Sequence, residues 1–286
     1  MINMRIVVCI KQVPDTREIR VDPETNNLIR NGVPSIMNPH DMEALKQALA
    51  IKADTGAEVV TVSMGPGQAV EILQESLDMG ADGAVLLSDR AFAGADTLAT
   101  GYTLSAAAKK LNADVIFCGA EAIDGCTAQV GPIIAEELGW PHFTHVTGLE
   151  IKETRSIVTR EIREGVETYE CEGPFVACIA QCAAEFTEPG AASDRKPEIW
   201  NLESLYFEPD RIGMRGSPTK VTKVIVSGKN TSGFIMIDGS LPVRERIRRI
   251  VNGGIEPQKV SLIRESPGTA AGIILNEEIL RNRLLS

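Results

Sequence analysis

The chain lacks the features that would place it in a membrane or on a nucleic acid. No run of about 18 apolar residues occurs in it, and its start, MINMRIVV, has neither the basic segment nor the cleavage site of a signal peptide. Its 29 basic and 39 acidic residues leave a net charge of −10, which disfavours binding to nucleic acid or to anionic membranes. We therefore expect a soluble, cytoplasmic protein without membrane insertion, whose partners are small molecules or other proteins.

Catalytic and metal-binding motifs are also scarce. The three histidines are His40, His142 and His145, and no serine or cysteine lies in a nucleophile-elbow or triad pattern, so covalent hydrolysis has no support. A Walker loop is absent, and so is the G-x-G-x-x-G fingerprint after the first expected strand. Six cysteines are expected to be thiols, and a buried strand explains the nearby Cys178 and Cys182 better than a metal site. We expect no catalytic side chain and no metal ligand.

What the sequence does contain is a regular alternation of strands and helices. Apolar runs predict strands, while proline, glycine and aspartate mark the helix ends. The expected order is strand 5–10, a helix from Pro39 to a stop at Gly56, strand 58–64, a helix through 70–77 ended by Gly80, strand 84–87, a helix capped by Asp96 and running to about 111, strand 113–118, and a helix that begins at 129–131 and ends at Gly139. Four such alternations with short connections predict a parallel sheet covered by helices on both faces. Ligands of such sheets bind at the carboxyl ends of the strands.

Three further stretches depart from this alternation. Apolar residues at 19–21 and 28–30 flank the turn-rich DPETNN and predict a small hairpin. After Gly139, segments 143–152, 156–163, 166–171 and 175–180 indicate antiparallel strands that extend the sheet. Segment 183–200 has no such periodicity and contains two prolines and a glycine, so it is expected to be a loop, either functional or disordered.

The strongest candidate for binding is the small-residue loop AEAIDGCTAQVG, which follows strand 113–118. Pro132 is tolerated only in a first helical turn, so the amides of residues 127–130 lie at a helix start. Unpaired amides at the positive end of a helix form a site for phosphate or another anion. A plain strand-to-helix turn capped by Thr127 is the alternative, and these residues by themselves leave both interpretations open.

A second small-residue turn, Gly65-Pro66-Gly67-Gln68, follows strand 58–64. Two such turns at strand ends that share one crevice favour a nucleotide site. Asn38 is a suitable N-cap for the helix that begins at Pro39. Asp41 either supports the first turn of this helix or points into the ligand site.

Several separated motifs resemble one family. The segments IVVCIKQVPDT, SIMNPHD, SMGPGQA, AIDGCTAQVGPIIAEELG and DRIGMRGSPTKV resemble the β subunit of electron-transfer flavoprotein, in the same order over about the first 225 residues. The resemblance implies a Rossmann-like (HUP-like), doubly wound α/β domain that binds an adenine nucleotide. It also implies a heterodimer with an α subunit that carries the electron-transferring FAD. Such a carrier exchanges electrons with flavin dehydrogenases. This activity requires correctly positioned cofactors and no acid-base side chains.

The resemblance also implies which residues contact the nucleotide, and they fall on the crevice described above. They are Cys9, Asn38, Pro39, His40, Asp41, Met64, Gly119, Ala122, Ile123, Asp124, Gly125, Cys126, Thr127, Ala128, Gln129 and Val130.

The most detailed expectation concerns the identity of the nucleotide. In the ordinary branch of the family the loop is close to D-D-D-C-N-Q-T-G and closes on the phosphate of AMP. Here residues 124–131 are D-G-C-T-A-Q-V-G, which resembles the D-G-D-T-A-Q-V-G of the FAD-binding, bifurcating branch. We therefore expect FAD, with AMP as the alternative, NADH as an electron donor and ferredoxin or flavodoxin as an acceptor. Cys126 replaces an aspartate of that pattern, and a cysteine beside a helix N-terminus can instead be a reactive thiolate.

The expected domains are a nucleotide-binding domain, 1–182, a partner-recognition loop, 183–200, and a C-terminal arm that contacts the α subunit, 201–286. We expect the loop to dock a flavin dehydrogenase of the acyl-CoA type. It departs from the family, because Thr187-Glu188-Pro189-Gly190 stands where an Asn-Glu-Pro-Arg-like stretch is usual. A rival from another class is a stand-alone nucleotide-binding module that resembles universal stress proteins.

Overall fold

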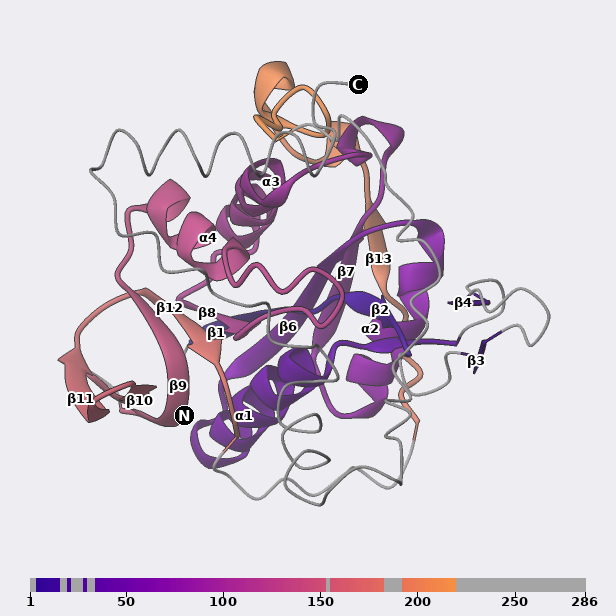
Figure 1. Ribbon diagram of the computed structural model, residues 1–286. Coiled ribbons are helices and arrows are strands. Elements are labelled where there is room, and N and C mark those ends of the chain that lie inside the picture. Colours follow the sequence, from indigo (N-terminus) through magenta and orange to yellow (C-terminus); the bar gives the residue numbers. More distant parts are fainter. Residues whose placement is uncertain are drawn as a thin grey trace, which may run out of the picture. The chain divides into compact units, whose positions relative to one another are not determined.

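A computed structural model describes residues 4–15, 20–21, 28–29, 34–152, 155–182 and 192–219. Its main sheet contains β1 (Arg5–Cys9), β6 (Glu58–Met64), β7 (Gly83–Leu87), β8 (Val115–Gly119), β9 (His142–Ile151), β10 (Ser156–Ile162), β11 (Gly165–Cys171), β12 (Phe175–Ile179) and β13 (Glu198–Trp200). These nine strands are arranged in the order β11-β10-β9-β12-β8-β1-β6-β7-β13 (Figure 1). All neighbouring strands from β9 to β13 in this order are parallel, whereas β10 is antiparallel to both of its neighbours, β9 and β11.

Helices cover both faces of the parallel part, as the alternation predicts. Helices α1 (Pro39–Thr55) and α2 (Val70–Asp78) pack on the face that receives Ile6 and Val8 of β1. Helices α3 (Thr97–Lys110) and α4 (Val130–Leu138) pack on the face that receives Val7 and Cys9. Successive residues of the central strand are therefore buried on opposite sides, which explains why β1 is a continuous apolar run. The predicted doubly wound α/β fold is confirmed.

The predicted helix ends are confirmed in their local chemistry. Gly56 takes a left-handed conformation (φ 77°) and donates its N–H to the carbonyl of Lys52, which closes α1. The Asp96 carboxylate accepts the N–H groups of Leu98 and Ala99 and so caps α3. Helix α4 begins at Val130, within the predicted interval.

Two small antiparallel pairs lie beside the main sheet. Strands β3 (Arg20–Val21) and β4 (Leu28–Ile29) form the predicted hairpin, whose turn, 22–27, lies outside the described residues. Strands β2 (Gln12–Pro14) and β5 (Ser35–Met37) form a second antiparallel pair. Because β2 follows directly from β1, this pair brings the start of α1 back to the end of the central strand.

The direction predicted for the strand at 175–180 is wrong. β12 is parallel to β8 and to the first half of β9, and it lies between them. All five of its residues are buried, which is typical of a strand inside a parallel sheet. The β9–β11 ribbon bends back at a β-bulge between Thr159 and Arg160, and Tyr169 of β11 contacts Phe143 at the start of β9.

The end predicted for the loop 183–200 is also wrong by three residues. β13 is an edge strand that pairs in parallel with β7. Three residues after a proline are too few to give a periodic signal, so the strand escapes sequence analysis. Residues 183–191 of this loop and residues 220–286 of the expected arm lie outside the described residues.

The segment after β13 lies along α3 (Figure 1). Phe207 packs edge-on against Phe92, at 5.3 Å between ring centroids, and the Arg211 guanidinium lies 4.0 Å from the ring centroid of Tyr102. At the start of α3, the hydroxyl of Ser217 accepts the N–H of Asp96 at 2.8 Å. The segment therefore fixes the N-terminal end of α3.

Candidate functional site

The candidate site lies where the order of the strands reverses. The chain proceeds from β1 to β6 and β7 on one side, and then returns through α3 to β8 on the other side of β1. The connections from β1 and β8 therefore leave in opposite directions and open a crevice at the carboxyl ends of these strands. The residues that follow these two strands, together with the start of α1, form its walls.

Asp41 ties the two strand ends to α1. Its carboxylate accepts the backbone N–H of Lys11 at 2.8 Å and that of Gly119 at 3.1 Å, through different oxygens. Burial raises its pKa to about 7, against the lowering effects of its hydrogen bonds with Asn38, Lys11 and Gly119 and of the Lys11 charge. Besides the two roles considered for Asp41, the structure shows a third, in which its carboxylate joins the ends of β1 and β8 to α1.

Only glycine fits at position 119. A Cβ atom built there would lie 2.3 Å from the Oδ1 atom of Asp41 and 2.7 Å from its backbone nitrogen. The absence of a side chain lets the end of β8 approach the first turn of α1.

Asn38 holds the loop between β8 and α4, which we call the 120–129 loop. Its side-chain amide donates to the carbonyl of Glu121 at 2.9 Å and its Oδ1 accepts the N–H of Ile123 at 3.1 Å. The residue occupies the N-cap position of α1, but its side chain makes no cap hydrogen bond there, so the expected capping role is wrong. It is fully buried, because both of its polar ends are satisfied by the loop.

The second half of the 120–129 loop exposes backbone N–H groups. Within the described part of the chain, no hydrogen-bond partner is found for the N–H groups of Thr127, Ala128 and Gln129. Cys126 and Ala128 have φ values of 49° and 53°, in the left-handed region that few residues other than glycine adopt. Alternation of left-handed and ordinary conformations turns successive N–H groups toward one side, as in anion-binding nests.

The alternative of a turn capped by Thr127 is wrong. The N-cap of α4 is Gln129, and its side chain makes no cap hydrogen bond. Its Oε1 instead accepts the hydroxyl of Thr97 at 2.8 Å, which joins the start of α4 to the start of α3. The free amides are therefore left available for a ligand.

An ion pair connects the 120–129 loop to the central strand. The Lys11 ammonium lies 2.7 and 2.8 Å from the two carboxylate oxygens of Asp124. Lys11 and Thr97 are contacts of the loop that the sequence analysis did not select. The signal for Lys11 was its place two residues after the end of β1, at the mouth of the expected crevice.

Three cysteine residues form a row under this loop. Cys9, Cys118 and Cys178 are directly paired across β1, β8 and β12, and a Cβ atom on Gly131 of α4 would lie 2.3 Å from the Cys178 Sγ. Hydrogen bonding with Cys9 and burial raise the pKa of Cys118, and burial raises that of Cys178 to about 12. The thiols of Cys118 and Cys178 therefore stay protonated. The three cysteines serve as small side chains that let α4 approach the sheet. In the part of the chain that the structure describes, no cluster suited to a metal ion occurs.

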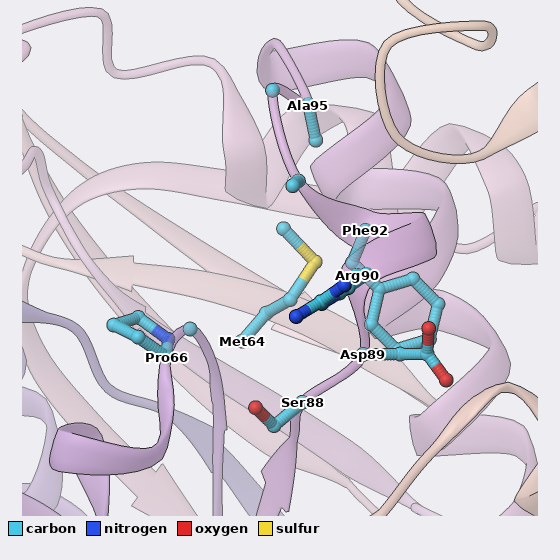
Figure 2. A pocket seen from close by; sticks show the side chains of 10 residues that line it. Met64, Pro66, Ser88, Asp89, Arg90, Phe92 and Ala95 are labelled. Carbon is cyan, nitrogen blue, oxygen red and sulfur yellow. The ribbon is translucent and has the colours of Figure 1, made fainter.

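A cavity of about 480 Å³ adjoins the crevice at the ends of β6 and β7. It is lined by Met64, Gly65, Pro66, Ser88, Asp89, Arg90, Phe92, Ala93, Gly94 and Ala95. Figure 2 shows the Arg90 side chain pointing toward Met64, while the carboxylate of Asp89 points away. Met64 and the Gly65-Pro66 turn, expected at the crevice, thus form one wall of a larger hollow.

The remaining predicted contacts occupy the rim of the crevice. Pro39 is exposed at the start of α1 and His40 is half-buried beside it. Residues 124–129 are exposed, whereas Ala122, Ile123 and Val130 are half-buried. The structure thus brings the predicted residues to one end of the sheet. Residues 88–95, which line the cavity, were not among the predicted contacts.

Comparison with known proteins decides the family. The model of the electron transfer flavoprotein domain matches residues 25–204. The chain belongs to the electron transfer flavoprotein family. It is 43% identical over 257 residues to the electron transfer flavoprotein subunit beta of Clostridium acetobutylicum, covering 87% of this chain and 97% of that protein. The predicted resemblance is confirmed, and the protein is an electron-transfer subunit of the β type.

Two further relatives are named for complexes with reductases. The chain is 47% identical over 228 residues to the caffeyl-CoA reductase-Etf complex subunit CarD of Acetobacterium woodii, covering 76% of this chain and 86% of the relative. It is 40% identical over 263 residues to the acryloyl-CoA reductase electron transfer subunit gamma of Anaerotignum propionicum, covering 87% and 97%. A search of the described helices finds none that is both long and apolar enough to cross a membrane.

Proposed function

We propose that this subunit works in a cytoplasmic heterodimer with an electron-transfer flavoprotein α subunit, and that its crevice holds FAD. The α subunit carries the FAD that exchanges electrons with a flavin dehydrogenase of the acyl-CoA type. The observation that carries the proposal is the crevice at the strand-order reversal, with free N–H groups on one wall and an adjoining cavity on the other.

The geometry favours FAD over AMP for two reasons. A pyrophosphate needs more amide donors and more room than a single phosphate, and Gly125 and Ala128 present little bulk beside the free N–H groups of residues 127–129. The cavity at Met64 and Arg90 offers space for a second ring system beyond the adenosine and its phosphate. AMP would leave this cavity unused.

A second flavin in this subunit would make the complex a candidate for electron bifurcation. In that proposal NADH donates an electron pair, one electron passes to the acyl-CoA-type dehydrogenase, and the other passes to ferredoxin or flavodoxin. Relatives that are named for caffeyl-CoA and acryloyl-CoA reductase complexes support this direction.

Cofactor content tests the proposal directly. The purified heterodimer should release two FAD and no AMP per complex on acid treatment. One FAD and one AMP would return the protein to the ordinary carrier class. A colourless homodimer that binds ATP would support the rival nucleotide-binding module and contradict both.

A further inference from the structure

The backbone of Lys11 is held in place by hydrogen bonds, whereas its side chain can move. Its N–H donates to Asp41 at 2.8 Å and its carbonyl accepts the N–H of Asn38 at 2.8 Å. The Cα of Lys11 is therefore held between the end of β1 and the start of α1. Only the flexible side chain can change its partner.

The ion pair between the Lys11 ammonium group and Asp124 is easily exchanged for another contact. The side chains of Lys11 and Asp124 are 50% and 34% exposed, and ion pairs as exposed as this one contribute little to stability. Breaking the pair therefore costs little. A phosphate that replaces Asp124 would offer the ammonium group stronger charge-assisted hydrogen bonds.

Asp124 also affects the charge at the free N–H groups. It precedes Thr127 by three residues in the same loop, and its carboxylate would repel an approaching phosphate. Pairing with Lys11 offsets this charge. The Lys11 ammonium group therefore contacts the same loop that carries the free N–H groups.

We propose that Lys11 is a phosphate-binding residue of the crevice, and that Asp124 competes with the nucleotide for the Lys11 ammonium group. The inference rests on the proposed nucleotide site and adds to it a specificity for anionic ligands. It gives opposite roles to the two partners of one ion pair. A pair that merely braces the loop would give both residues the same role.

The test is the rate at which the bound adenine nucleotide leaves the αβ complex. The complex is diluted into excess unlabelled FAD or AMP, whichever acid release identifies, at low and at moderate ionic strength. Lys11→Met should accelerate release by about tenfold or more, the factor expected for one lost hydrogen bond to a charged group, and should reduce its salt dependence. Lys11→Arg, which keeps the charge, should restore slow release.

Asp124→Asn should slow release, because the ammonium group is no longer shared, and the double variant should release the nucleotide faster than Asp124→Asn alone, because the ammonium group is lost. Lys46→Met breaks the ion pair of Lys46 with Glu43, at 3.0 Å on α1, and serves as the control. Faster release from both single variants, with the double variant no faster than either of them, would show a brace and overturn the proposal.

Failure of this inference is distinguishable from failure of the proposed function. A wild-type complex without any adenine nucleotide or second flavin would contradict the function itself. A wild-type complex that holds the nucleotide, with Lys11→Met no faster than Lys46→Met, would contradict only the role of Lys11.

Discussion

At the scale of single residues, the crevice is built from contacts that the sequence pattern could not specify. Asn38 and Asp41 were expected to contact the ligand, and their roles as ligands remain predictions. What the structure adds is that both hold protein groups: Asn38 holds the 120–129 loop, and Asp41 holds the ends of β1 and β8. The position of a polar residue beside a strand end predicts that it lies in a site. The position alone does not predict which neighbouring group forms hydrogen bonds with that residue.

Gly119 gives the sharpest test of this construction. Gly119→Ala would force a Cβ atom to within 2.3 Å of Asp41, so the variant should lose about 1–3 kcal/mol of stability and part of its bound nucleotide. Gly67→Ala is the matched control, because a Cβ atom there meets no atom within 4 Å. Urea unfolding of the two complexes measures the difference. Equal midpoints would mean that the end of β8 can move away from α1 at no cost.

Asp41 should also make the stability depend on pH. Because burial raises its folded pKa from 3.8 to about 7, its favourable contribution is complete below the unfolded value and is lost as the pH rises through about 7. Lys11 attracts the charged form and opposes this loss, while the buried thiols Cys118 and Cys178 face the carboxylate as neutral groups.

The measurement compares wild type with Asp41→Asn at about pH 5 and about pH 8. The substituted side chain lacks one acceptor, so the variant should be less stable than wild type at the lower pH, and the gap should narrow at the higher pH. Asp54→Asn, at an exposed site on the same helix, is the control. A gap that widens with rising pH would contradict the raised pKa.

At the scale of elements, prolines, glycines and capping aspartates made the helices predictable. The ends of α1, α3 and α4 depend on Pro39, Gly56, Asp96 and Pro132, whose backbone chemistry acts locally. The direction of β12 was not predictable, because it depends on the pairing of β12 with β8 and β9, which are not adjacent to it in the chain. β13 was missed because three residues carry no period.

The proposed docking loop can be tested with these elements in view. Ser193 donates its N–H to Asp78 at 2.9 Å, which lowers the pKa of that carboxylate, and Arg195 donates to the carbonyl of Asp82 at 2.9 Å. These contacts anchor the chain to the end of α2 and to the turn before β7, so a deletion that spares them should not disturb the fold.

Removal of residues 188–191 should leave flavin content and unfolding midpoint unchanged and slow electron transfer to the acyl-CoA-type dehydrogenase. Stopped-flow reduction of the complex by that dehydrogenase measures the effect. Ser193→Ala, which keeps the backbone N–H, is a control that should transfer electrons at the wild-type rate. Unchanged transfer after the deletion would remove the docking role.

At the scale of the whole described molecule, the strand-order reversal predicts where a ligand binds. Sequence alternation predicts a parallel sheet but not the order of its strands, which follows from how far each helical crossover travels. Placing β8 beside β1 brings residues 9, 38–41 and 119–130 to one end of the sheet although they are far apart in the chain. The resemblance to the family had already indicated that these three segments lie together.

The same geometry predicts how ligand removal should affect the molecule. Stripping the nucleotide from the complex should expose the N–H groups of Thr127, Ala128 and Gln129, which have no partner in the part of the chain that is described. They should exchange with deuterium rapidly in the stripped complex and slowly in the loaded one.

The amides of β1 and β8 should exchange slowly in both states, since they are bonded within the sheet. The β10–β11 hairpin, at the edge of the sheet beyond β9 and β12, should be unchanged and provides the internal control. Hydrogen exchange followed by mass spectrometry resolves these segments. Equal protection of 127–129 in both states would place the anion elsewhere, whereas slower exchange throughout the sheet would indicate a general stabilisation in place of direct contact at the loop.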